Sequence, residues 1–326
     1  MSVNPERASL LNETHERLQT IGLSDPRVTI AAAAAIEGAR EVLAIHGASP
    51  EVLKVEYKAK DGDTPKTVAD THSGTVIKRL IRDQFPEDRI NEEESGDEKG
   101  TASEGNAWHV DPLDGTSSYA EGQRYSTVGI AVYSSKRPYA AVICHPFERE
   151  LVVAVAGKGA FLYRLAGEKE LEDLWGSPSG LKVEGLFMTT DCRQIEVSKA
   201  PTLVGGIAYI DALFNSKTRD SKFTFMAGLV DLAGNNLGFR MSGSNIDQQL
   251  KVAKGSARLT LTDAVGGFFD LAAGGLAIIE AGGKFTDVNG HSVNESTQVA
   301  IGTNGPMHDD VLELARVCYQ GYQGFR

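Results

Sequence analysis

The chain has 326 residues, of which 41% are apolar, so it has room for one large domain or two ordinary ones, each with a proper core. Its formal net charge of −11 argues against a general binder of nucleic-acid polymers, because such proteins depend on clustered Lys and Arg. A small phosphorylated substrate is still compatible with this charge, since bound divalent cations can supply positive charge locally.

The cysteines and the N-terminus indicate a cytoplasmic protein. Cys144, Cys192 and Cys318 are far apart and form no CxxC or Cys/His pairing, so we expect reduced cysteines rather than a zinc site or a disulfide framework. The N-terminal MSVNPERASL is polar and lacks the apolar stretch of a signal peptide. No apolar run approaches the length of a membrane span, so no membrane partner is expected.

Residues 1–27 predict a short helix followed by a loop at 24–26. Two further predicted helices follow, separated by a loop or hairpin. Alanine content and apolar spacing predict a helix over 28–47, which ends at Gly47. Turn signals in 58–70 predict the loop or hairpin. The apolar face of the second helix consists of Ile77, Leu80, Ile81 and Phe85. Asp70 lies at or near the start of this helix, where capping alone would account for an Asp.

From Ala107 to Phe161 the pattern predicts β-strands. Alternating apolar residues are followed by the runs YAAVICH and ELVVAVA, and the connections between them are short. Short connections favour antiparallel neighbours in one sheet. Residues 162–200 are charged and contain Gly and Pro, and we interpret them as the connection between two domains.

The remaining chain predicts further strands and helices. TLVGGIAYI (202–210) predicts a strand, and FDLAAGGLAIIEAGG (269–283) predicts a helix closed by its two final glycines. GKFTDVNGHSV (283–293) predicts a strand and a turn. The last segments, TQVAIG (297–302) and PMHDDVLELARVCYQ (306–320), predict a strand and a helix. Helices and strands come in groups rather than in a regular βαβ repeat, which favours a layered α+β fold.

The stretch WHVDPLDGTSSYAEG (108–122) places Asp111 and Asp114 on one short turn. Carboxylates this close repel each other unless a cation lies between them. A calcium-binding EF-hand loop would need oxygen ligands at its first and third positions, where this chain has Val110 and Pro112. The sequence therefore argues against an EF-hand.

The geometry we favour for this stretch is a strand that ends at Val110, a tight turn, and a helix that opens around Gly115. Both carboxylates then emerge at the end of the strand, beside the backbone N–H groups of Gly115 and Thr116, which form a site for an anion. The alternative is an acidic turn in which Asp114 is an ordinary N-cap.

Three further stretches carry acids near predicted helix or strand ends. The run INEEESGDE (90–98) alone would be a solvated loop. TVAD places Thr67 and Asp70 before a helix, and FFDLAAG places Asp270 at the start of another helix.

In chain order, T-x-x-D, E-E-E-S, D-P-L-D-G-T and F-D-L-A-A-G resemble the signature of the inositol monophosphatase family, the lithium-sensitive, magnesium-dependent phosphatases. The resemblance runs from about Thr29 to Gly290. It implies an α+β fold, the layered αβαβα sandwich of the sugar-phosphatase superfamily. Residues 1–195 would form an N-terminal α+β half with most metal ligands, and residues 196–326 a C-terminal α/β half that contributes Asp270 and part of the substrate pocket. It also implies a homodimer.

The same resemblance implies a set of metal ligands. Glu93 would be a shared ligand, and Asp111 would bridge two cations. The backbone carbonyl of Leu113 would serve the first cation, and Asp114 and Asp270 would hold the second. Such hard oxygen ligands suit Mg²⁺, of which the family implies two or three per active site.

The implied reaction is hydrolysis of a small phosphate monoester, such as an inositol, sugar or nucleotide phosphate, by a metal-activated water. Glu93 would activate the water. Thr116 would orient it, with Asp70 accepting the hydrogen bond of the threonine hydroxyl. The amides of Gly115 and Thr116 would hold the phosphate.

Three departures from the family pattern affect these assignments. Phe269 stands where the family usually has Trp, so an aromatic residue is retained. Glu92 extends the usual glutamate pair to a triplet, and alternation along a strand predicts that Glu93 is the one that faces the site. In the segment 253–267, which helps to shape the family's substrate pocket, Ala257-Arg258 replaces the usual Ala-Asp.

The substrate is therefore open. The length of the loop KAKDGDTPKTVAD (58–70) resembles 3′(2′),5′-bisphosphate nucleotidases and histidinol-phosphate phosphatases more than the inositol enzymes. A catalytically silent protein that binds a phosphorylated metabolite is the alternative outside the enzymes.

Overall fold

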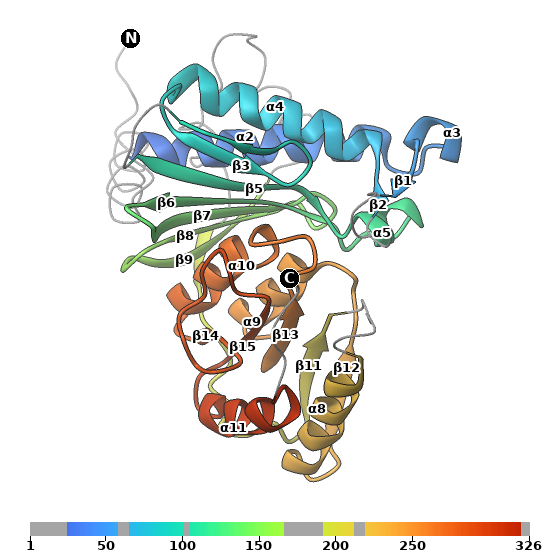
Figure 1. Ribbon diagram of the computed structural model, residues 1–326, viewed down its shortest axis with the longest axis vertical. Coiled ribbons are helices and arrows are strands. Elements are labelled where there is room, and N and C mark those ends of the chain that lie inside the picture. The colour runs from blue at the N-terminus through green and yellow to red at the C-terminus, as the bar shows by residue number, and fades with distance from the viewer. Residues whose placement is uncertain (1–24, 58–64, 101–104, 166–191, 212–218, 321–326) are drawn as a thin grey trace, which may run out of the picture.

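The structure is a computed structural model that describes residues 25–57, 65–100, 105–165, 192–211 and 219–320. Two sheets alternate with helical layers (Figure 1). The helices are α2 (Pro26–Ile45), α3 (Pro50–Leu53), α4 (Val68–Gln84), α5 (Thr116–Ala120), α8 (Arg219–Leu232), α9 (Asn245–Ala253), α10 (Phe269–Glu280) and α11 (His308–Cys318). Among these helices, none has the length and apolarity needed to cross a bilayer.

The larger sheet has eight strands in the order β10-β9-β8-β7-β6-β5-β3-β4. They are β3 (Arg89–Glu92), β4 (Gly96–Glu98), β5 (Asn106–Asp114), β6 (Thr127–Ser134), β7 (Arg137–His145), β8 (Glu150–Val155), β9 (Gly159–Arg164) and β10 (Cys192–Ile195). All pairs are antiparallel except β3–β5, which is parallel. The predicted antiparallel neighbours over 107–161 are confirmed.

The smaller sheet has five strands in the order β12-β11-β13-β15-β14. They are β11 (Gly206–Ile210), β12 (Leu237–Arg240), β13 (Leu259–Asp263), β14 (Lys284–Asp287) and β15 (Val299–Thr303). Strands β12, β11 and β13 are parallel, and β15 and β14 continue the sheet antiparallel. A separate pair, β1 (Glu56–Tyr57) and β2 (Pro65–Lys66), forms the predicted hairpin, whose connection lies outside the described residues.

The layers follow the order αβαβα, as predicted. Helices α2 and α4 cover one face of the larger sheet, α9 and α10 lie between the two sheets, and α8 and α11 cover the far face of the smaller sheet (Figure 1). Alternate residues of β6 enter different cores, because Ile130 packs in the core with α2, whereas Ala131 packs in the core with α10. Both faces of the sheet are covered, which explains why its central strands are apolar at nearly every position.

Helix α2 begins two residues earlier than predicted, at Pro26, because Asp25 caps it and accepts a hydrogen bond from the backbone N–H of Arg27. Its alanine run is buried throughout. A Cβ on Gly38 would lie 2.7 Å from Ile77 Cδ1, so α2 and α4 approach closely. The small side chains of α2 therefore allow α2 and α4 to pack closely against each other.

The predicted end of strand β5 is wrong, and so is part of the predicted connection over 162–200. Strand β5 continues to Asp114 instead of ending at Val110, with a shift in register between Asp111 and Asp114. Pro112 has no N–H to donate, and such a shift lets a sheet accommodate it. The segment 162–200 is more than a connection, because β9 and β10 pair within the larger sheet on either side of the undescribed residues 166–191.

The three cysteines all lie in described segments and form no disulfide, and Cys144 is the one that is fully buried.

Candidate active site

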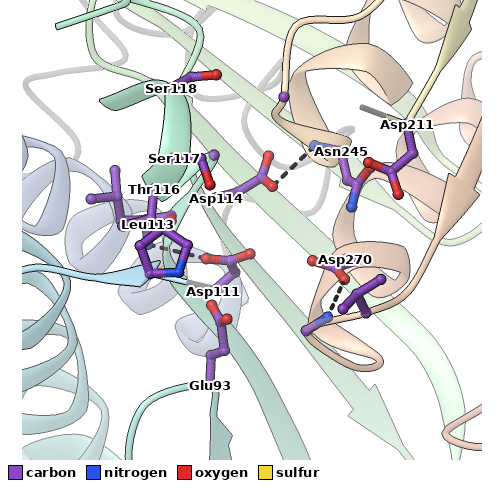
Figure 2. Close-up of a pocket in the computed structure, with 15 residues that line it drawn as sticks. Glu93, Asp111, Leu113, Asp114, Thr116, Ser117, Ser118, Asp211, Asn245 and Asp270 are labelled. Carbon is purple, nitrogen blue, oxygen red and sulfur yellow. Dashed lines mark hydrogen bonds between the residues drawn. The ribbon is translucent and has the colours of Figure 1, made fainter. Parts of the chain in front are cut away.

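A pocket of about 160 Å³ lies where β3 and β5 end, against α9 and α10 (Figure 2). It contains every predicted site residue except Asp70, which lies behind Thr116. The lining residues are Pro65, Glu93, Asp111, Leu113, Asp114, Gly115, Thr116, Ser117, Ser118, Asp211, Gly243, Asn245, Val265, Gly266 and Asp270. Residues from distant parts of the chain thus share one small cavity.

Three buried carboxylates, those of Asp111, Asp114 and Asp270, each place one oxygen within 4.8 Å of the others. None of them forms an ion pair with a basic side chain of the described residues. Burial, and after it the charge of Glu93, raises the pKa of Asp111 and of Asp270 well above the ordinary value. Burial raises the pKa of Asp114 to about 6. A divalent cation would relieve this repulsion.

A second group of possible metal ligands, His145, Glu148 and Asp247, differs from the first because a basic side chain lies beside its acids. The ammonium of Lys251 lies 3.1 Å from Asp247 Oδ1 and 2.9 Å from Glu148 Oε1, so a positive charge is already present. The N–H of Glu148 donates to His145 Nδ1, which leaves the proton of a neutral ring on Nε2. This group is a salt-bridge network between β7 and α9, and we do not assign it a metal.

Glu93 follows directly after β3, and its N–H donates to the carbonyl of Val110. Its carboxylate points toward Asp111 (Figure 2). A Cβ built on Gly266 would lie 3.2 Å from both Glu93 Oε1 and Asp270 Oδ2, which places these two acids around the same point. A glycine at 266 keeps this space open.

Glu92 points the other way, as strand alternation predicts. Its carboxylate is buried beside Gly74 of α4 and accepts hydrogen bonds from the N–H groups of Glu94 and Ser95. The ammonium of Lys78 lies 3.6 Å from it. Glu92 therefore stabilises the turn that carries Glu93.

Asp114 caps a helix, but not the one that follows it. The N-cap residue of α5 is Gly115, whereas the Asp114 carboxylate accepts hydrogen bonds from the N–H groups of Asn245 (3.0 Å) and Ile246 (2.8 Å) at the start of α9. The hydroxyls of Ser244 and Thr127 also donate to it. The alternative of an ordinary N-cap on the next helix is therefore wrong, and Asp114 joins β5 to the second half of the chain.

Gly115 is required by both conformation and space. Its φ is +85°, and a Cβ would lie 2.8 Å from Ser244 Cβ and 3.1 Å from the carbonyl oxygen of Gly243. The turn after Asp114 therefore lies directly against the loop that precedes α9. Only glycine permits this approach without strain.

Thr116 and Asp70 connect the pocket to α4. The hydroxyl of Thr116 lies 2.8 Å from Asp70 Oδ1 and 2.9 Å from the carbonyl oxygen of Leu113, and it can donate to either. Asp70 Oδ2 accepts hydrogen bonds from the N–H and hydroxyl of Thr67, which complete a capping box. Burial raises the pKa of Asp70 to about 7. Asp70 thus caps α4 and contacts Thr116 at the same time.

Sequence reasoning missed Asp211 and Asn245, which both line the pocket. Asp211 follows directly after the parallel strand β11, and ligands commonly bind at the carboxyl ends of such strands. Its position after the predicted strand over 202–210 could therefore have identified it. Of the segment 253–267, only Val265 and Gly266 line the pocket. Arg258 instead donates to the carbonyls of Thr202 and Val204, so the replacement at this position lies away from the cavity.

Residues 25–319 match the family model described as the inositol monophosphatase family. The chain belongs to this family. It is a phosphoric monoester hydrolase on the inositol monophosphatase scaffold, and members of the family act on small phosphorylated substrates and generally use divalent metal.

Curated relatives support this family assignment. An inositol-1-monophosphatase from Synechocystis is 27% identical over 91% of this chain and 91% of that protein. The Nus factor SuhB of Salmonella typhimurium is 30% identical over 81% of this chain and 86% of that protein. Solved structures support the fold: the IMPase of Thermotoga maritima has a TM-score of 0.71 and 22% identity, over 90% of this chain and 98% of that one. The inositol monophosphatase of Anabaena has a TM-score of 0.65 and 24% identity, over 87% and 93%.

Proposed function

We propose that this member hydrolyses a small phosphate monoester with Mg²⁺ as its cofactor. The observation that carries the proposal is the convergence of Asp111, Asp114 and Asp270 in one pocket, buried and without an ion-pair partner in the described part of the chain. Buried acids in this arrangement are costly unless a cation or protons neutralise them.

The residues present suit Mg²⁺. We propose that the carboxylates of Glu93, Asp111, Asp114 and Asp270 and the carbonyl of Leu113 hold two or three ions, because all of these are hard oxygen ligands. When bound, Mg²⁺ lowers the pKa of a coordinated water and neutralises charge on the phosphate and the leaving oxygen.

The side chains of the chain itself would position the reactants. The Thr116 hydroxyl directs its proton to Asp70 or Leu113, which leaves a lone pair to accept a hydrogen bond from the attacking water. We propose that Glu93 accepts the proton of this water. The amides of Gly115 and Thr116 would hold the phosphate oxygens, because backbone N–H groups at such a turn bind anions.

The pocket favours a small substrate. Its volume of about 160 Å³ fits a phosphate and part of a leaving group, and among its described lining residues there is no Lys, Arg or His for a second phosphate. This composition favours an inositol, sugar or amino-alcohol phosphate over a nucleoside bisphosphate.

We also propose a cytoplasmic homodimer that lithium inhibits, as the family implies.

The test is release of inorganic phosphate from a panel of inositol, sugar, nucleoside and histidinol phosphates, with and without Mg²⁺. We expect Mg²⁺-dependent release from at least one small ester, and inhibition by lithium against a sodium control. Absence of release from the whole panel in Mg²⁺ would favour the silent phosphometabolite-binding protein. Light scattering after size-exclusion chromatography tests the dimer.

A further inference from the structure

We propose that a second cavity binds an anion with an aromatic body and acts as an effector site separate from the active-site pocket. This cavity lies between the second half of α2 and the end of β7, two elements that pack against each other (Figure 1). Its volume is about 280 Å³, compared with about 160 Å³ for the active-site pocket, and the two share no lining residue. This volume is close to the lower end of the range for small-molecule sites, roughly 300 Å³.

Three arginines line the cavity, whereas none of its described lining residues is acidic. They are Arg40 of α2, Arg124 in the loop after α5, and Arg149 in the turn between β7 and β8. An acid-free lining contrasts with the whole chain, which has 44 acidic and 33 basic residues. Arg124 and Arg149 are exposed, and within the described part of the chain their side chains form no hydrogen bond or ion pair. Two guanidinium groups are therefore open to an anion.

The turn that carries Arg149 separates this side chain from its acidic neighbours. Glu148 and Glu150, on either side of it, both place a carboxylate oxygen on the ammonium of Lys254, at 3.0 and 2.7 Å. Arg149 itself has a φ of +52°, which few residues other than glycine adopt. Its carbonyl oxygen accepts a 2.8 Å hydrogen bond from the N–H of Leu165. Unusual backbone conformations of this kind are common at binding sites, and here the turn leaves the guanidinium at the cavity.

The rest of the lining is mainly apolar and includes an aromatic ring. Ile36 and Leu43 of α2 line it together with Phe147 and Leu165. Leu43 is 45% exposed, so apolar surface is accessible beside the arginines. Aromatic rings and guanidinium planes both stack on flat aromatic groups. The lining therefore suits a flat ring that carries a carboxylate, sulfonate or phosphate.

The cavity is connected to α5, the short helix that begins at Thr116. The ring of His46 lines the cavity and lies edge-on to Tyr119 of α5, with 5.3 Å between the ring centroids. His46 Nε2 lies 3.2 Å from the carbonyl oxygen of Gln123, which directly precedes Arg124. The Tyr119 hydroxyl donates to a backbone carbonyl of α2 at 2.8 Å. A ligand in the cavity thus contacts the segment that positions Thr116. This effector role rests on the proposed function, whereas binding does not.

Calorimetric titration in EDTA tests binding with three probes: 2-naphthalenesulfonate, 2-naphthol and inorganic sulfate. Without metal, the clustered acids of the active-site pocket repel anions, so that pocket does not compete for the probes. We expect wild type to bind one 2-naphthalenesulfonate per chain. The affinities for naphthol, which lacks the anion, and for sulfate, which lacks the ring, should each be lower by about tenfold or more.

Two substitutions locate the bound probe. Arg124→Ala and Arg149→Asn should each weaken binding of 2-naphthalenesulfonate about tenfold. Asn tolerates a positive φ, so the second variant keeps the turn. Arg137→Ala is the matched control, because Arg137 is also exposed but lies at the opposite end of β7, and it should bind the probe like wild type. Absence of binding by wild type, equal weakening in all three variants, or unchanged affinity in Arg124→Ala and Arg149→Asn would overturn the site.

Phosphate release in Mg²⁺ tests the effector role. Saturating 2-naphthalenesulfonate should change kcat by about twofold or more, and Arg149→Asn should need about tenfold more probe for the same effect. Binding in EDTA without phosphate release from any ester would refute the proposed function and leave the site standing. Phosphate release with a kcat that the bound probe does not change would overturn the effector role. Inhibition that competes with substrate and is equally strong in Arg149→Asn would place the probe in the active-site pocket, which would also overturn that role.

Discussion

The carboxylate of Asp114 accepts a 2.8 Å hydrogen bond from the backbone N–H of Ile246, so the last residue of β5 caps α9. This contact joins the larger sheet to the helical layer between the sheets at the point where the acids converge. It also gives Asp114 a structural role in addition to its place in the acid cluster, whereas Asp111 and Asp270 have few hydrogen bonds to lose.

Asparagine at these three positions should therefore have opposite effects on stability. Asp111→Asn and Asp270→Asn should abolish turnover and raise the unfolding free energy of the metal-free protein by about 1 kcal/mol, because each removes a repelling charge. Asp114→Asn should lower it by about 1 to 2 kcal/mol, because its amide group opposes the helix N–H groups. Urea unfolding in EDTA measures both. Equal shifts for the three variants, or turnover by Asp111→Asn at saturating Mg²⁺, would contradict the assignment.

Substitutions at the neighbouring residues Glu93 and Glu92 should affect turnover and stability, respectively. Glu93→Gln should lower kcat by about two to four orders of magnitude, the scale of losing a general base, with the fold unchanged. Glu92→Gln should retain nearly normal kcat but lower the unfolding free energy by about 1 kcal/mol, because its buried carboxylate accepts several hydrogen bonds. Steady-state kinetics and urea unfolding of the two variants provide the comparison. If Glu92→Gln loses more activity than Glu93→Gln, the catalytic acid must be reassigned.

Gly115→Ala should inactivate the protein and destabilise it by about 3 kcal/mol, because a strained φ and a close contact with Ser244 act together. Gly122 offers a matched control: its φ is +75°, but a Cβ there meets nothing within 4 Å. Gly122→Ala should cost only about 1 kcal/mol and keep its activity. Thermal unfolding and phosphate release test the pair. Similar behaviour of the two variants would show that the contact with the loop before α9 has no effect.

The metal-free protein should lose stability as pH rises from about 4 to about 7. The pKa of Asp70 is raised to about 7 and that of Asp114 to about 6, from 3.8 for an unperturbed Asp. In this window the folded state retains protons that the unfolded state has released, so the unfolding free energy falls with pH. We expect melting temperatures in EDTA to decline across this range and Mg²⁺ to reduce the decline. A melting temperature in EDTA that rises with pH would contradict this.

Much of the site was predictable from short stretches of sequence. The turn with Asp111, Asp114 and Gly115 belongs to one continuous segment, and alternation along β3 correctly oriented Glu93 relative to Glu92. These features depend on neighbours within a few residues, and side-chain direction along a strand has a period of two. Asp70 could likewise be placed at a helix start, because capping is a local interaction.

The sequence and the tertiary structure determined different features of this protein. The sequence by itself determined the layered α+β fold and the order of the acidic motifs, because hydrophobic periodicity and turn-forming residues depend only on nearby positions in the chain. Only the folded molecule decided that Asp114 caps α9, that Gly115 lies against Ser244, and that Asp211 and Asn245 share a pocket with the turn after β5. Each of these relationships joins residues roughly a hundred or more positions apart, and the packing of the two sheets across α9 and α10 brings them together.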